Sequence, residues 1–112
     1  VGITQREMKD YTAALLSHKY ALHITLKLFG ENHPDTAESY EVIGETQYEM
    51  EDYTSALQSH QHALQIRLKL YGEDHPDTAK SYEIVELVQE RIKGDVGIVP
   101  NEKKSLYWLK HL

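Results

Sequence analysis

The chain has 112 residues, of which 40% are apolar and 27% charged, so it has room for one small globular domain. Its formal net charge is −6 and its longest basic run is Lys103-Lys104, which disfavours binding to nucleic acid or to an anionic membrane surface. It contains no cysteine, which excludes disulfides and thiolate metal sites, and no apolar run approaches the ~20 residues that a membrane-spanning helix needs.

A duplication with an offset of 42 residues organises the sequence. Asp10-Tyr11-Thr12 recurs at 52–54, and the five residues that begin at His33 recur from His75. Between residues 8–41 and 50–83, 24 of the 34 aligned positions are identical. Self-similarity at a fixed period is typical of repeat proteins, whose stacked units share one continuous core.

The spacing of the apolar residues predicts helices over 3–9, 11–29, 34–50, 53–71 and 76–93. Gly2 aligns with Gly44, so the chain is expected to open halfway along the first helix of a repeat. Pro34 suits the first position of a helix, and Gly30 and Gly72 suit the position that follows a helix. The predicted fold class is therefore all-α, with antiparallel helix pairs.

Each complete unit offers two faces for packing. The first helix presents one face at helical spacing, and the second presents a wider one. The first face consists of Thr36, Tyr40, Ile43, Gln47 and Met50, and the second of Ala56, Leu57, His60, Ala63, Leu64, Arg67, Leu68 and Tyr71.

The third unit departs from this pattern. Glu86 stands where Gly2 and Gly44 stand, and a long charged side chain there obstructs the close approach of a second helix. We divide the chain into a partial repeat (1–33), a full repeat (34–75) and the first helix of a third repeat (76–93). Residues 94–100 are interpreted as a linker, and 101–112 as a tail or a short capping helix with Leu106, Leu109 and Leu112 on one side.

The small residues Gly44, Ala56 and Ala63, with Tyr40 and Ile43 ahead of them, resemble the tetratricopeptide repeat pattern. The 42-residue length and the phrase Gly-Glu-Asp-His-Pro-Asp-Thr-Ala over 72–79 are similar to the long repeats of nephrocystin-type proteins and kinesin light chains. The resemblance implies helix-turn-helix repeats in a short right-handed solenoid. It also implies a cytoplasmic scaffold or adaptor that binds a protein or peptide in a concave groove. The alternative is a structural spacer or self-association element of a larger multidomain protein.

A row of glutamates marks the predicted groove. In this repeat class one side of the first helix lines the concave surface, and glutamates 38, 41, 45 and 49 share one side of that helix. A solvated face is the alternative interpretation. Leu87, which aligns with Glu45, adds an apolar contact, so the expected partner is basic or apolar. The candidate groove residues are Glu38, Glu41, Glu45, Tyr48, Glu49, Glu83 and Leu87.

The seven histidines do not form a metal-binding pattern. His60 and His62 are two residues apart and His18 and His23 are five apart, whereas ligands side by side on a helix are three or four apart. His33 and His75 precede prolines and are expected to act in caps or turns, while His18 and His60 are expected to pack between helices. No phosphate-binding loop or nucleophile motif is found. We therefore predict no metal, no cofactor and no enzymatic activity.

The incomplete first repeat predicts weak self-association through the open repeat ends. The helix over 11–29 is expected to be only half covered, with Leu15, Leu22 and Leu26 as the exposed patch.

Overall fold

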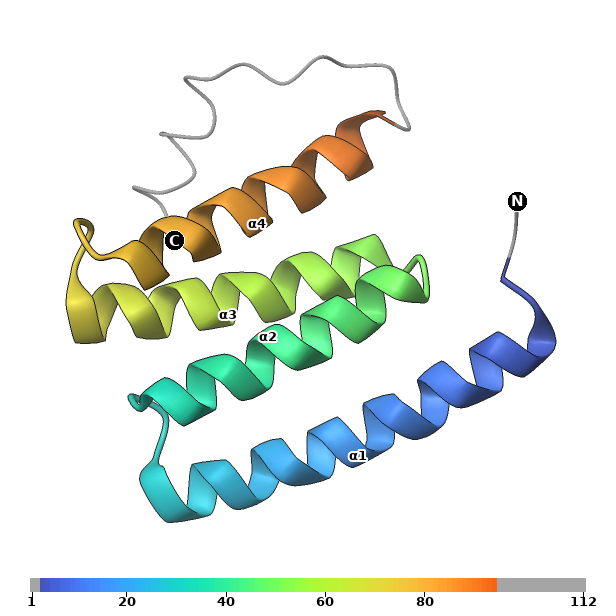
Figure 1. Cartoon of the computed structure of the whole chain (residues 1–112), viewed down its shortest axis with the longest axis horizontal. Coiled ribbons are helices and arrows are strands. Elements are labelled where there is room, and N and C mark those ends of the chain that lie inside the picture. The colour runs from blue at the N-terminus through green and yellow to red at the C-terminus, as the bar shows by residue number, and fades with distance from the viewer. Residues whose placement is uncertain (1–2, 95–112) are drawn as a thin grey trace.

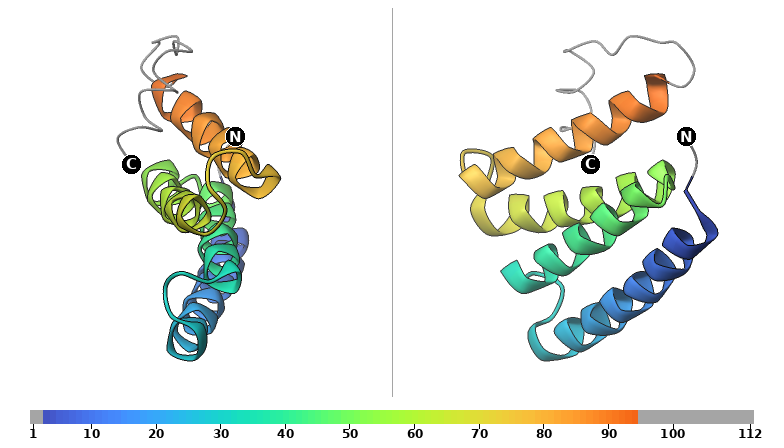
Figure 2. Two further views of the ribbon diagram at one scale, coloured as in Figure 1. Left: turned by 90° about the vertical axis from the view of Figure 1, so that its left-hand side faces the viewer. Right: turned by 45° about the vertical axis from the view of Figure 1, so that its right-hand side comes forward.

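The computed structural model of the chain describes residues 3–94, which form an all-α array (Figure 1). Its helices are α1 (Gln5–Phe29), α2 (Pro34–Glu49), α3 (Tyr53–Tyr71) and α4 (Pro76–Gly94). Each helix runs antiparallel to the one before it and packs against it, so that α1 and α4 lie at opposite ends of the array. Both views in Figure 2 show the same order of helices. The linker and tail predicted after residue 94 lie outside the described residues, apart from Gly94 itself.

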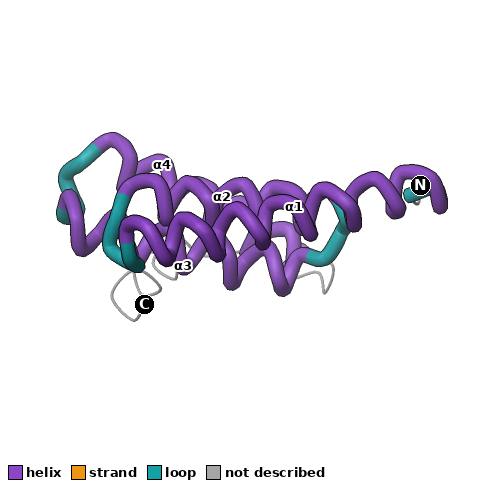
Figure 3. The backbone as a smooth tube through the Cα atoms, turned by 90° about the horizontal axis from the view of Figure 1, so that it is seen from below, coloured by secondary structure: helices purple, strands orange, loops and turns teal. Residues whose placement is uncertain are grey.

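The prediction of separate helices over 3–9 and 11–29 is wrong. These residues form the single helix α1, whose N-terminal turns project beyond the ends of the other helices (Figure 3). The helix begins after Thr4, whose hydroxyl accepts a hydrogen bond from the backbone N–H of Glu7 at 3.1 Å and donates one to the Glu7 carboxylate. The Thr4 side chain thus caps the N-terminus of the helix. A helix of two turns that folded back would bury too little to nucleate, whereas extending α1 adds a hydrogen bond with each residue.

The same helix–loop junction occurs twice, after α1 and after α3. Gly30 and Gly72 follow the two helices with φ of +80° and +81°, a conformation that glycine adopts at little cost. His33 and His75 then precede the prolines that open α2 and α4. Nδ1 of each imidazole accepts a hydrogen bond at 3.1 Å, from the N–H of Asp35 and of Asp77 respectively. The predicted capping role of these histidines is confirmed.

The helices α2 and α3 approach each other closely at Gly44, in the middle of α2. A Cβ atom at this position would lie 2.6 Å from Nε2 of His60 on α3, so only glycine allows the two helices to approach so closely. Ala56 and Ala63 are buried on the same side of α3, and His60 itself is buried. The small residues and the packed His60 that the sequence predicted therefore hold α2 and α3 together.

The exposed patch on α1 differs from the predicted one. Leu15, Leu22 and Leu26 are half-buried, because α2 packs on that side of the helix. Four exposed apolar residues form a ridge with a spacing of four residues on the other side, made of Leu16, Tyr20, Ile24 and Leu28. No residue of α1 is fully buried.

Candidate partner-binding site

An open pocket lies between α2 and α4, the first helices of two successive repeats. Its volume is about 340 Å³, within the range of ligand-binding pockets. Leu87 of α4 is 59% exposed at the pocket, although it is a large apolar residue. The lining consists of Glu45, Tyr48, Glu49, His60, Ile84, Leu87 and Val88. The structure thus brings together four of the predicted groove residues, namely Glu45, Tyr48, Glu49 and Leu87.

The carboxylates of the pocket carry the charge of the site. Glu45 and Glu49 lie one helical turn apart on α2, and both side chains are on the exposed side of the helix. Partial burial, and then the negative charges of Glu41 and Glu49, raise the pKa of Glu45 above its ordinary value. A bound cation would relieve this repulsion, so the pocket combines an apolar wall with a site that favours positive charge.

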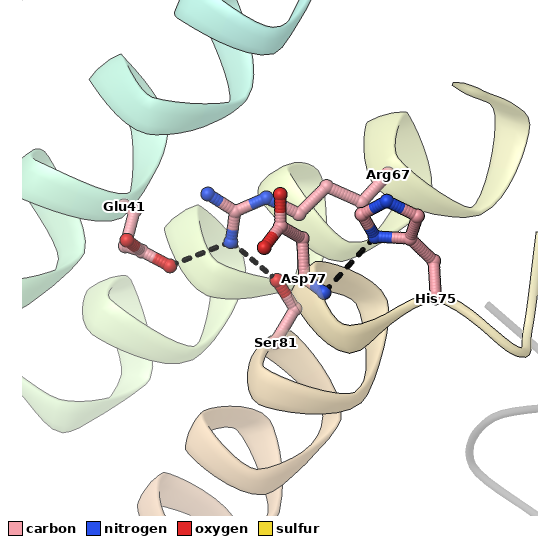
Figure 4. Close-up of polar contacts among 5 residues, drawn as sticks. All are labelled: Glu41, Arg67, His75, Asp77 and Ser81. Carbon is pink, nitrogen blue, oxygen red and sulfur yellow. Dashed lines mark hydrogen bonds and ion pairs between the residues drawn. The ribbon is translucent and has the colours of Figure 1, made fainter. Parts of the chain in front are cut away.

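Glu41 has a different role from the one predicted for it. Its carboxylate accepts a hydrogen bond from Nη1 of Arg67 at 2.7 Å, and the same Nη1 donates to the hydroxyl of Ser81 at 2.7 Å (Figure 4). These three residues come from α2, α3 and α4. The side chains of the ion pair are only 12% and 14% exposed. Glu41 therefore joins helices together, and the glutamate row of α2 is not uniformly solvated.

Two further predicted residues lie away from the pocket. Glu38 lines a separate shallow pocket between α1 and α2, next to His18 and Asp35. Glu83 is exposed on α4 and does not line the pocket between α2 and α4.

An aromatic pair with a cation extends the site along α4. The rings of Tyr48 and Tyr53 meet edge to face with centroids 5.0 Å apart. The guanidinium of Arg91 lies 6.0 Å and 5.5 Å from these two centroids. A second open pocket here shares Tyr48 and Leu87 with the first, so a groove runs from the carboxylates of α2 towards Arg91. Cation–π contacts of this kind hold the end of α4 against the turn between α2 and α3.

Comparison with known proteins agrees with this architecture. Residues 1–69 match the model of the tetratricopeptide repeat family. The chain belongs to the tetratricopeptide repeat family. Tetratricopeptide repeats generally mediate protein–protein interactions, so a surface for a protein partner is the relevant kind of site. A comparison with curated proteins finds none that matches.

Sequence reasoning missed three residues of this tetratricopeptide groove. Ile84, Val88 and His60 line the pocket, and the latter two are buried. His60 was predicted to pack between helices, which it does, but its ring also reaches the pocket. Ile84, Leu87 and Val88 follow the i, i+3, i+4 spacing of one helix face, a signal that could have marked an apolar wall. Among residues 3–94 no group of three acidic or histidine side chains is placed to hold a metal, and no helix is apolar and long enough to cross a membrane.

Proposed function

We propose that the chain is a protein-binding module whose groove between α2 and α4 takes a peptide segment with an apolar side chain next to a lysine or arginine. The observation that carries this proposal is the pocket itself, where the exposed Leu87 and the carboxylates of Glu45 and Glu49 line one cavity. An apolar side chain would cover Leu87 and Ile84, and its basic neighbour would face the carboxylates.

Charge supports a basic partner over an acidic one. Glu45 and Glu49 stand on one edge of the pocket, where partial burial, and then the charges of Glu41 and Glu49, raise the pKa of Glu45 although Lys80 opposes the shift. A partner carboxylate placed here would add a third negative charge and be repelled. Arg91 is at the far end of the groove, where it lies over Tyr48 and Tyr53. Glu90 also lines that end and offsets the charge of Arg91, so the unbalanced negative charge of the groove lies at Glu45 and Glu49.

The proposed role is that of a scaffold or adaptor that works in the cytoplasm, with no catalytic step. Resemblance to nephrocystin-type proteins and kinesin light chains supports the adaptor role. The negative charge of the chain disfavours nucleic acid and membrane surfaces as partners.

The test measures the binding of labelled peptides by fluorescence anisotropy. Three peptides of equal length suffice: one with a leucine between lysines, one with a leucine between glutamates, and one with a serine between lysines. The first should bind best, and its affinity should fall as salt rises, because exposed charge pairs are screened.

Variants separate the effect of the groove from the general negative charge of the chain. Glu45→Lys combined with Glu49→Lys should weaken binding of the leucine–lysine peptide at least about tenfold, by loss of two attractions and gain of two repulsions. Glu38→Lys combined with Glu83→Lys is the matched control, because it reverses two exposed glutamates that do not line this pocket. Leu87→Ser should weaken both leucine peptides. A preference for the acidic peptide, or equal effects of the two double charge reversals, would refute the proposal.

A further inference from the structure

The packing between α2 and α3 has a small apolar cluster at its centre. Ala37 of α2 meets Ala63 and Ile66 of α3, and each of these is at most 2% exposed. Tyr40 of α2 and Leu70 of α3 pack against this cluster. The cluster thus has two halves, an Ala–Tyr half on the first helix of the repeat and an Ala–Ile–Leu half on the second.

Each half occurs once more, alone, at one end of the array. With the 42-residue offset, α1 carries the second half as Ala21, Ile24 and Leu28. The residue types are the same as in α3, yet Ile24 is 40% exposed and Leu28 is 70% exposed, whereas Ile66 is 2% exposed. No described helix covers Ile24 or Leu28, while Ala21 is exposed at the edge of the shallow pocket between α1 and α2.

Among residues 3–94, the first half occurs without its partner on α4, at the opposite end of the array. Ala79 and Tyr82 are the counterparts of Ala37 and Tyr40. Ala79 is exposed, while Ala37 is completely buried. The two ends of the array (Figure 1) therefore present complementary halves of the same cluster.

We propose that a second copy of this chain is the partner for these two faces. In this arrangement α4 of one copy packs on α1 of the next copy in the same way as α2 packs on α3 within one chain. The contact joins two different faces, so it is heterologous and adds copies head to tail. It lies apart from the groove between α2 and α4 and does not depend on the function proposed for that groove.

An aromatic contact of the α2–α3 interface has a counterpart in this junction. Within the chain, Tyr40 stacks on His62 with ring centroids 4.4 Å apart. Tyr82 takes the place of Tyr40 and Tyr20 takes the place of His62. Tyr20 is 68% exposed, and a stack on Tyr82 of the next copy would cover it.

Glu86 makes the junction between two copies weaker than the interface between α2 and α3. It stands at the position of Gly44, and His18 stands at the position of His60. A Cβ atom at residue 44 would already lie 2.6 Å from the His60 ring, so Glu86 holds α4 further from α1 than α2 is from α3. In the proposed junction its carboxylate faces the His18 imidazole of the next copy. The imidazole can donate a hydrogen bond to the carboxylate, which keeps the two helices in contact across the wider gap. Removing the side chain of Glu86 should therefore tighten the association.

Sedimentation velocity over a concentration series of the full chain tests the proposal. The chain should form oligomers whose size grows with concentration. Ile24→Asp should weaken the association at least about tenfold, by placing a charge in the rebuilt cluster. Glu86→Gly should strengthen it about tenfold, whereas Glu90→Gly, an exposed control on the same helix with the same backbone change, should not. A monomer at every concentration, for both the parent chain and Glu86→Gly, would overturn the proposal.

Cysteine cross-linking fixes which faces meet. The chain has no cysteine, so Ala21→Cys and Ala79→Cys each introduce one thiol, at the counterparts of the packed pair Ala63 and Ala37. Mixing the two variants, one with a size tag, should give mostly the mixed disulfide. Cross-linking of Ala21→Cys with itself at an equal rate would show that two α1 faces meet, and would overturn the head-to-tail arrangement.

Ile24→Asp should leave peptide binding in the groove unchanged, and Glu45→Lys should leave self-association unchanged, so that the two proposals fail independently.

Discussion

Arg67 and Glu41 form a largely buried ion pair, with Nη1 of the arginine 2.7 Å from Oε2 of the glutamate. The same nitrogen donates to the hydroxyl of Ser81, so a single guanidinium ties α3 to both α2 and α4. Glu83 is the counterpart of Glu41 one repeat later, and it is exposed. The two glutamates therefore occupy equivalent sequence positions with different surroundings.

Replacing Glu41 by glutamine should lower the free energy of unfolding by about 1–3 kcal/mol, because it leaves Arg67 without its carboxylate in a poorly solvated place. Glu83→Gln should change stability by less than ~0.5 kcal/mol, as exposed substitutions usually do. Urea unfolding followed by circular dichroism measures both. Equal effects of the two variants would contradict the joining role of Glu41.

Gly44→Ala should destabilise the chain by about 1–3 kcal/mol, because the added methyl group meets the His60 ring, which is 3% exposed. Gly94→Ala is the control, since a Cβ at that end of α4 meets nothing within 4 Å. Alanine also favours a helix over glycine by up to ~1 kcal/mol, so this control should be neutral or stabilising. In a His60→Ala background the penalty at Gly44 should vanish, and a double-mutant cycle measures that coupling. A penalty that survived in this background would place the strain elsewhere.

His60 should make stability depend on pH in the mildly acidic range. Burial lowers its pKa in the folded chain below the ordinary value of 6.5; Glu41 opposes this shift and the charge of Arg67 adds to it. As pH falls below about 6.5, the unfolded chain therefore binds the proton more readily than the folded chain. The free energy of unfolding decreases until the pH reaches the folded-state pKa.

His60→Gln should flatten the decrease in stability between neutral pH and the mildly acidic range. The measurement is urea unfolding at several pH values, and the difference between variants cancels the contributions of the other titrating groups. His23, which is exposed on α1, provides the control through His23→Gln. If the His60 variant keeps the full slope of the parent chain, the buried imidazole is not the source of the pH dependence.

The sequence was sufficient to predict α2, α3 and α4 to within one residue at each end. Pro34 at a helix start and Gly72 after a helix end are local signals, and they act through backbone geometry alone. Of the groove residues, Glu45 and Leu87 could be found because aligned repeats place equivalent residues on equivalent sides. Glu41 could not be assigned, because its partner Arg67 becomes visible only when three helices are placed together.

The start of α1 could not be predicted by alignment with the second repeat. Met8-Lys9-Asp10 and Met50-Glu51-Asp52 occupy equivalent positions and differ in one residue, yet the first is helical and the second forms a turn. The turn follows from the packing of α2 back on α3, which is tertiary structure. Local sequence is therefore similar in both places, and the packing decides the conformation.

Glycine substitutions at the equivalent positions Glu51 and Lys9 should have opposite effects. Glu51 has φ of +66°, while its N–H donates to the carbonyl of Tyr48 at 2.9 Å. A side chain in this left-handed conformation costs about 1 kcal/mol, so Glu51→Gly should stabilise the chain by up to that amount. Lys9 lies inside α1, where glycine costs about 0.5–1 kcal/mol.

The sign of the two changes is what tests the continuous helix. If residues 8–10 formed a turn like that at 50–52, Lys9 would share the left-handed conformation of Glu51, and glycine would stabilise both positions. With α1 continuous from Gln5 to Phe29, Lys9→Gly should instead lower both the helical signal in circular dichroism and the midpoint of urea unfolding. Lys9→Ala serves as the control, because it removes the same side chain while keeping a strong helix former. Stabilisation by Lys9→Gly relative to Lys9→Ala would show that the chain turns at residue 9.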